Sequence, residues 1–365
     1  MLARRLSCLF FAVLNIFCLG FSPVILSDAD IPRCGLTSHQ IVAMRQMSLP
    51  EISAASYILV NTSTGQILQA HNEHARRAPA SLVKIVTALV ALRRGRQDQE
   101  IQIQSSDLRV YSATHLQTGE ELSLRQLLFM MLIPSDNAAA MAIARALGGD
   151  VQTYVGWMND LVAEWGLENT HFANPHGLDH EGNYSTAYDS ARIAWQAMRD
   201  PVFADIVGRA EAVAAFRILE STNELLGTYP GTIGVKTGTT DLAGECLVSM
   251  VDRPHGQALL VVMGSEDRFE DSRLMLDYFY TNFAELNVDL RETPQNRYLD
   301  GEGQWHAFGL QEPHIFLVPP WQRRTASFYR RIDNPSRAPG LQEPVGILEV
   351  RLMGKPFSEL VLYVR

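Results

Sequence analysis

This chain has few cysteines and no excess of positive charge. Its 365 residues include four cysteines and ten histidines, and no Cys/His cluster has the spacing of a metal site. Lys and Arg total 31 against 40 Asp and Glu, which gives a formal net charge of −9 at pH 7. We therefore expect no metal or other cofactor, and no nucleic acid as a partner.

Few of the cysteines are placed to form disulfides. Cys8 and Cys18 fall in the apolar N-terminal stretch, so Cys34 and Cys246 remain. Cys246 lies in a strand-like apolar segment. We therefore expect it to be a buried free thiol rather than half of a disulfide.

A long apolar run stands at the N-terminus. Arg4 and Arg5 precede it, and it extends from Leu6 to Leu26. This pattern resembles an export signal, here residues 1–27. Removal after Ser27 and retention as an N-terminal membrane anchor both fit the length of the run. In either case we expect the rest of the chain outside the cytoplasm, in the periplasm or at the cell surface.

Three short motifs follow one another along the chain. They are Ser81-Leu82-Val83-Lys84, Ser135-Asp136-Asn137 and Lys236-Thr237-Gly238. Each is weak alone, but the three in this order are typical of acyl-transfer enzymes in which a lysine, rather than a His–Asp pair, activates a serine.

The first motif begins a predicted helix. Pro79-Ala80 precedes Ser81, and apolar residues recur behind it at helical spacing to about Arg93. Residues three apart share a helix face, so the Lys84 amine can reach the Ser81 hydroxyl. The helix N-terminus would also direct free N–H groups toward an anion formed there. The alternative is a capping serine beside an unrelated surface lysine.

The second motif is expected in a loop between two helices. Ser123 and Gln126 form a capping-box pattern at the start of the first helix, and Asn137 opens an alanine-rich second one. Such a loop would hold Ser135 and Asn137 above a cleft, although plain loop capping is the alternative. Ser221-Thr222-Asn223 also fits a Ser-x-Asn pattern, but we reject it because it lies too close to the third motif.

The third motif ends a predicted strand, residues 232–238, and two further strands follow at 244–251 and 258–262. Such a meander forms an antiparallel sheet with Lys236 at the edge of the cleft. Gly238 has no side chain, so an extended substrate backbone could pair with this edge. A solvated strand end is the alternative.

The predicted fold class is α+β. We expect a hairpin at 57–69, helices at 151–165, at 187–198 (with a Thr186…Asp189 capping box) and at 268–283, and the meander near the end. One antiparallel sheet covered by helices on both faces then forms a catalytic domain, residues 36–286. Strand-like stretches at 315–318, 327–329, 345–352 and 360–364 predict a small β domain, residues 297–365.

From about Ser56 to its end, the sequence resembles the serine-type D-alanyl-D-alanine carboxypeptidases, which are low-molecular-mass penicillin-binding proteins. The stretches 80–87, 172–179 and 234–248 carry the resemblance. The loop Pro175-His176-Gly177-Leu178-Asp179 is its most specific part, because class A β-lactamases share the three motifs. The resemblance implies the β-lactamase/DD-peptidase fold, a peptidoglycan stem peptide as substrate and β-lactams as covalent inhibitors.

The resemblance also bears on membrane attachment. Many members continue into an amphipathic C-terminal helix that lies on the membrane. This sequence stops directly after its last predicted strand. We therefore expect any attachment to come from the N-terminal run.

The acylation step that these residues imply begins at Ser81, which attacks the carbonyl between the two terminal D-alanines. Lys84 is the expected base, because burial and the nearby charge of Lys236 would keep its amine neutral. The N–H groups of Ser81 and Thr239 would bind the oxyanion. Ser135 would relay a proton to the leaving nitrogen.

The remaining predicted site residues bind substrate or serve the second step. Asn137 would hold the acyl-chain amide, and Lys236 and Thr237 the free carboxylate of the substrate. His176 would either position the deacylating water or hold its loop in place by hydrogen bonds.

Three other functions stay open. A DD-endopeptidase would cut cross-links with the same residues. A class A β-lactamase would need a glutamate in a Glu-x-x-Leu-Asn loop. No segment with this pattern lies between Ser135 and Lys236. A non-catalytic wall-binding protein would have lost a catalytic group, and none is missing.

Overall fold

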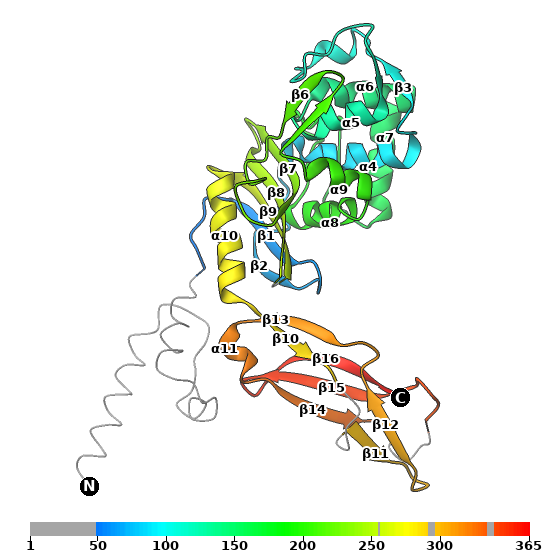
Figure 1. The fold of residues 1–365 in the computed structure, drawn as a ribbon, viewed down its shortest axis with the longest axis vertical. Helices are drawn as coiled ribbons and strands as arrows, with labels where there is room; N and C mark the ends of the chain where they lie inside the picture. Colours follow the sequence, from blue (N-terminus) through cyan, green and yellow to red (C-terminus); the bar gives the residue numbers. More distant parts are fainter. Residues whose placement is uncertain (1–48, 255, 291–295, 334–338) are drawn as a thin grey trace, which may run out of the picture. The chain divides into compact units, whose positions relative to one another are not determined.

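The computed structural model describes residues 49–254, 256–290, 296–333 and 339–365. The chain divides into two compact units (Figure 1). The first is Ser48–Val288 with Ile315–Val318, and the described part of the second is Asp289–His314 with Pro319–Arg365. The predicted export segment 1–27 and Cys34 lie outside the described residues. Within the described ranges, no helix combines the length and the apolar character needed to cross a membrane.

A five-stranded antiparallel sheet forms the centre of the first unit, with the strand order β2-β1-β9-β8-β7 (Figure 1). Its strands are β1 (Ser56–Asn61), β2 (Ile67–His71), β7 (Thr232–Thr240), β8 (Gly244–Arg253) and β9 (Gly256–Ser265). The predicted hairpin and meander are confirmed. Cys246 on β8 is a buried free thiol, also as predicted. β7 is an edge strand, so one of its sides has no neighbouring strand in this sheet.

Helices cover both faces of this sheet, which confirms the α+β class. α10 (Arg268–Asn282) packs on one face, where Leu59, Leu260 and Phe279 are buried. Replacing such a leucine with alanine typically costs about 2–5 kcal/mol of stability. α4 (Val83–Arg94) and α8 (Ala187–Ala197) belong to the core on the other face. The remaining helices of this unit are α5 (Leu124–Leu132), α6 (Asn137–Gly148), α7 (Val151–Glu164) and α9 (Pro201–Val207).

Side-chain caps explain where several of these helices begin. Ser123 and Gln126 form the predicted capping box at the start of α5. Thr186 accepts a hydrogen bond from the Asp189 N–H at 2.9 Å, as predicted for α8. The Asp189 carboxylate, however, accepts from Thr170 at 2.7 Å instead of turning back to the helix start. Only half of that predicted box therefore forms. Each such cap contributes about 1 kcal/mol.

The first unit also contains short paired strands and 3-10 turns. The sequence analysis did not predict β3 (Glu100–Gln102) with β4 (Glu121–Ser123), or β5 (Glu211–Ala214) with β6 (Arg217–Glu220). The 3-10 turns are η1 (Ala80–Leu82) and η2 (Asp107–Arg109).

The stretch 315–318 does not pair as expected. It was predicted within the small β domain, but it lies in β13 (His314–Val318), which pairs with β10 (Ala284–Val288). Gln66 exchanges two hydrogen bonds with the backbone of Leu317, at 2.9 and 3.0 Å. The apolar pattern indicated the strand correctly, but pattern alone does not identify the partner strand.

The second unit contains a five-stranded sheet in the order β11-β12-β16-β15-β14. Its elements are β11 (Arg297–Leu299), β12 (Trp305–Gly309), α11 (Pro320–Arg323), β14 (Ser327–Ile332), β15 (Pro344–Leu352) and β16 (Lys355–Val364). β14, β15 and β16 contain the other predicted stretches, whereas β11 and β12 were not predicted. Leu348, Val350 and Leu362 are fully buried and give this sheet its core.

Candidate active site

Ser81 lies in η1, which leads directly into α4. Lys84 follows in the first turn of α4, and its Nζ lies 2.8 Å from the Ser81 Oγ. The two residues therefore share a helix face, as their spacing predicted. Ser81 is partly buried, whereas Lys84 is completely buried.

Two oxygen atoms from distant parts of the chain also contact the Lys84 amine. They are the Asn137 Oδ1 at 2.6 Å and the His176 backbone carbonyl oxygen at 2.9 Å. Asn137 is the first residue of α6. Its side-chain oxygen is therefore already bonded to Lys84. The Asn137 NH₂ group can still donate to the acyl-chain amide that was assigned to this residue from the sequence.

The pKa of Lys84 is lowered well below the ordinary value of a lysine. Burial is the main cause, because a charged amine loses its hydration there. The charge of Lys236 lowers the pKa further, and the Asp136 carboxylate opposes both effects. The direction and its two main causes agree with the prediction, and they favour a neutral amine that can accept a proton.

Lys236 lies in the middle of β7 and is 1% exposed. Burial, followed by the charge of Arg268, lowers its pKa to about 7. Its Nζ donates to the Thr237 carbonyl oxygen at 3.2 Å. An anion bound beside this amine would favour the ammonium form. The site thus has one strongly depressed lysine and a second that titrates near neutral pH.

Arg268 is a site residue that the sequence analysis missed. It is the first residue of α10, and its guanidinium donates to the Gly238 carbonyl oxygen at 2.8 Å and to the Thr239 hydroxyl at 2.7 Å. A salt bridge of 3.4 Å to Glu245 fixes it further. Thirty residues separate Arg268 from Gly238, so no local motif could have indicated this contact.

Two glycines allow a strand and a loop to approach the Ser81 turn closely. A Cβ on Gly238 would lie 2.9 Å from both the Ser81 nitrogen and the Ala80 Cβ. A Cβ on Gly177, whose φ is +88°, would overlap the Ala80 carbonyl oxygen. From the sequence, Gly238 was explained by an approaching substrate. The structure supplies a nearer reason, which is the packing of β7 against the Ser81 turn.

Ser135 lies in the loop between α5 and α6 with a φ of +66°. The next residue, Asp136, fixes this loop. It caps α6 through the Ala139 N–H at 2.9 Å, and it accepts from both the N–H and the hydroxyl of Thr114 at 2.7 Å. The Ser135 hydroxyl makes no hydrogen bond with any of the described residues, Ser81 and Lys84 included.

The His176 ring is directed to its own loop. Its Nδ1 accepts a hydrogen bond from the Leu178 N–H at 3.1 Å. Burial, followed by the charge of Lys84, lowers its pKa to about 4, so the ring is neutral near pH 7. It is the His176 backbone carbonyl, not the ring, that contacts Lys84.

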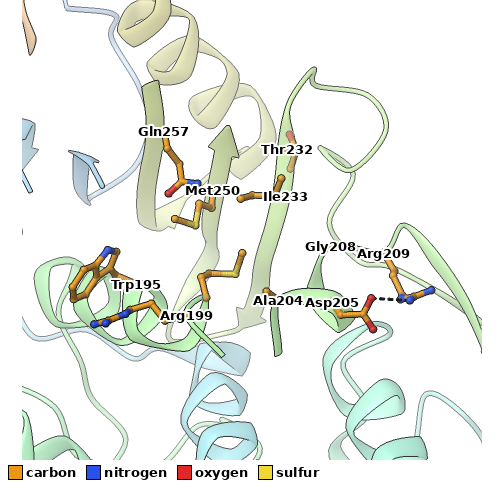
Figure 2. A pocket seen from close by; sticks show the side chains of 11 residues that line it. Trp195, Arg199, Ala204, Asp205, Gly208, Arg209, Thr232, Ile233, Met250 and Gln257 are labelled. Carbon is orange, nitrogen blue, oxygen red and sulfur yellow. Dashed lines mark hydrogen bonds and ion pairs between the residues drawn. The ribbon is translucent and has the colours of Figure 1, made fainter. Parts of the chain in front are cut away.

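A separate hollow of about 480 Å³ opens near the beginning of β7 (Figure 2). Trp195 of α8 and Arg199, which follows that helix, lie on one side of the hollow (Figure 2), and Ile233 and Met250 lie on β7 and β8. The other lining residues are Met198, Ala204, Asp205, Gly208, Arg209, Thr232 and Gln257. None of the predicted site residues lines this hollow, so it is distinct from the cluster around Lys84.

Comparisons with known proteins identify the family of this chain. The sequence model of the peptidase S11 family, described as D-alanyl-D-alanine carboxypeptidase, matches residues 43–267. The chain is 32% identical over 337 residues to the D-alanyl-D-alanine carboxypeptidase DacA of Escherichia coli K12, covering 87% of this chain and 84% of that protein. It is 31% identical over 285 residues to DacF of Bacillus subtilis 168, with coverages of 74% and 70%.

Among solved structures, penicillin binding protein 5 from Haemophilus influenzae is similar. It matches with a TM-score of 0.74 and 26% identity, covering 87% of this chain and 98% of that one. The fold, the three motifs and these relatives lead to one conclusion: the chain belongs to the peptidase S11 family of serine D-alanyl-D-alanine carboxypeptidases.

Proposed function

We propose that the carboxypeptidase reaction of this chain uses Ser81 as nucleophile and Lys84 as base, and that it removes the terminal D-alanine of peptidoglycan stem pentapeptides. The three contacts of the Lys84 amine carry this assignment. A neutral amine has two N–H groups and one lone pair. The oxygens of Asn137 and His176 only accept, so they take the two N–H groups. The lone pair is then left for the proton of the Ser81 hydroxyl.

Acylation begins when the Ser81 Oγ attacks the carbonyl carbon of the penultimate D-alanine and its proton passes to Lys84. We assign the oxyanion to the N–H groups of Ser81 and Thr239. The close packing of Gly238 against the Ser81 nitrogen supports this, because it puts the end of β7 beside the nucleophile. The proton then passes through Ser135 to the leaving nitrogen, the C–N bond breaks, and an ester remains on Ser81.

Binding of the substrate carboxylate falls to Lys236 and Thr237. An ammonium and a hydroxyl both donate to a carboxylate, and hydrogen bonds to charged groups are the stronger kind. Arg268 adds positive potential at the same end of β7. The NH₂ group of Asn137 remains available to donate to the carbonyl of the acyl chain.

Deacylation reverses these roles. Water attacks the Ser81 ester, Lys84 takes the water proton, and the proton returns to the Ser81 oxygen as the ester bond breaks. We assign His176 to holding its loop, and thereby its carbonyl, against Lys84. The support is that its ring bonds to Leu178 within the same loop.

Cellular setting and domain limits extend this proposal. We propose that residues 1–27 export the chain and are then removed or kept as an anchor, so that the enzyme works on the cell wall outside the cytoplasm and influences cell shape. Residues 36–286 would form the catalytic domain and 297–365 the small β domain. β-Lactams would acylate Ser81 and so inhibit the enzyme.

The test compares two substrates of the purified chain. D-Alanine release from a stem pentapeptide is measured against cleavage of a cross-linked dimer, with Ser81→Ala as the matched inactive variant. Release from the pentapeptide that Ser81→Ala abolishes supports the proposal. Faster cleavage of the dimer would identify a DD-endopeptidase that uses the same residues. D-Alanine release by Ser81→Ala at the wild-type rate would overturn the assignment of the nucleophile.

A further inference from the structure

The Ser-x-Asn pattern rejected from the sequence, Ser221-Thr222-Asn223, lies at the catalytic site. It follows β6 and precedes β7. The Thr222 Oγ1 lies 2.5 Å from the Thr237 Oγ1. The Thr222 N–H donates to the Ile133 carbonyl oxygen at 3.2 Å, two residues before Ser135. A single residue thus connects the strand of the third motif to the loop of the second.

We infer that Thr222 is a positioning residue that directs the Thr237 hydroxyl toward the substrate carboxylate. This inference rests on the proposed function of Thr237. A threonine hydroxyl has one hydrogen to donate, and a carboxylate only accepts. Thr237 can therefore bind the carboxylate only if it donates to it. The hydrogen bond between the two threonines must then be donated by Thr222.

The burial of the two residues fits these directions. Thr237 is 4% exposed, so few groups other than the substrate and Thr222 can reach its hydroxyl, whereas Thr222 is exposed. Donation from Thr222 to Thr237 and from Thr237 to the carboxylate forms a chain in which each bond polarises the next. With the carboxylate bound, the Thr222 hydroxyl thereby fixes the rotation of the Thr237 hydroxyl.

The segment that carries Thr222 is itself held in place. The Ser221 N–H donates to the Ala210 carbonyl oxygen at 2.8 Å. Asn223 is buried, and its Oδ1 accepts from the Leu225 N–H at 3.2 Å. Thr222 is thus anchored through its own backbone and through both neighbours. A substitution of its side chain leaves all of these backbone contacts in place.

The first test uses three single variants. Thr222→Val removes the hydroxyl and keeps the shape, Thr222→Ser keeps the hydroxyl, and Thr228→Val is the matched control. Thr228 is an exposed threonine of the same segment whose hydroxyl donates to the Glu224 carbonyl oxygen. We expect Thr222→Val to lower kcat/KM for the pentapeptide about five- to tenfold, mainly through a higher KM. The rate of acylation by a labelled penicillin, which also carries a carboxylate, should fall by a similar factor.

The serine variant and the control should stay within about twofold of the wild type, since neither loses the hydroxyl pair. If Thr222 had a purely structural role, Thr222→Val would instead lower the melting temperature, and KM would not rise more than kcat falls. Wild-type kcat/KM in Thr222→Val would overturn the inference.

The second test repeats Thr222→Val in a Thr237→Val background. If Thr222 acts through the Thr237 hydroxyl, the second substitution should cause no further loss. The same five- to tenfold loss in both backgrounds would mean that Thr222 acts independently of Thr237, and the inference would fail. A failure of the proposed function would be seen in a different experiment, in which Ser81→Ala would still release D-alanine.

Discussion

Arg268 donates a 2.8 Å hydrogen bond from its guanidinium to the carbonyl oxygen of Gly238. Gly238 in turn lies so close to the Ser81 nitrogen that a Cβ there would stand 2.9 Å from it. The first turn of α10 is therefore linked to Ser81, the proposed nucleophile, through two successive contacts. Because Arg268 also lowers the pKa of Lys236, it acts on both the geometry and the charge of the site.

Removing this arginine should shift the pH profile. In the proposed mechanism Lys236 binds the substrate carboxylate as an ammonium, so kcat/KM of the wild type should fall as pH rises through its pKa of about 7. Arg268→Gln removes a neighbouring positive charge and raises that pKa, so the fall should begin at higher pH. The lost hydrogen bonds should also lower kcat/KM at least tenfold, roughly.

The control for this profile is Arg273→Gln, which removes a charge from the same helix. The causes of the lowered Lys236 pKa are burial and the charge of Arg268, and Arg273 is not among them. The alkaline limb of the kcat/KM profile of Arg273→Gln should therefore match that of the wild type. An alkaline limb unchanged in Arg268→Gln would contradict the assigned charge effect.

Lys236 should make the fold less stable below neutral pH. Its pKa is about 7 in the folded chain against an ordinary value of 10.5. Between these values the unfolded chain binds more protons, so stability rises with pH by up to about 1.4 kcal/mol per unit. Below pH 7 the folded chain carries the buried charge and none of this gain is present. Lys236→Met should therefore be more stable than the wild type at pH 6, and its advantage should shrink toward pH 9.

Urea unfolding at pH 6, 7.5 and 9 measures this difference. Lys355→Met, at an exposed position, is the control and should follow the wild type at every pH. A difference between Lys236→Met and the wild type that does not change with pH would argue against a buried titrating amine.

Gly238→Ala should lose both activity and stability. The added methyl group would press on the Ala80 Cβ and the Ser81 nitrogen, and overpacking of this kind costs about 1–3 kcal/mol. A nucleophile displaced by about 1 Å costs about 100-fold in rate. Gly156→Ala in α7 is the control, because the added methyl group would point into open space. This substitution should stabilise the helix by about 1 kcal/mol. Wild-type turnover by Gly238→Ala would show that the two segments are not tightly packed.

Local sequence signals predicted the parts of the fold and site that depend on near neighbours. The spacing of Ser81 and Lys84 is a property of one helical turn, and the structure places the two side chains 2.8 Å apart. The Ser123 and Gln126 box likewise needs only four consecutive residues. Such signals locate a motif and the start of a helix without any knowledge of the tertiary structure.

Contacts between distant segments could not be predicted in the same way. Ser221-Thr222-Asn223 was rejected as the second motif, and nothing in the sequence indicated that the chain before β7 places the Thr222 hydroxyl against that of Thr237. Arg268 reaches Gly238 only because α10 packs across the sheet. Residues 315–318 were predicted within the small β domain, but β13 pairs with β10, because the apolar pattern of a strand does not identify its partner strand. In each case the missing information is the pairing of segments, which the local pattern does not contain.

The transfer of the Ser81 proton to Lys84 is tested most directly by the rate of acylation with a labelled penicillin. Wild type, Ser81→Ala and Lys84→Met are compared at equal concentration, and the labelled peptide is identified by mass spectrometry. The adduct should lie on Ser81 and be absent from Ser81→Ala. Lys84→Met should fold, since methionine fills a buried site without a charge, and its acylation should be slower by about 10²–10⁴-fold. Acylation of Lys84→Met at the wild-type rate, or an adduct on another residue, would contradict the account.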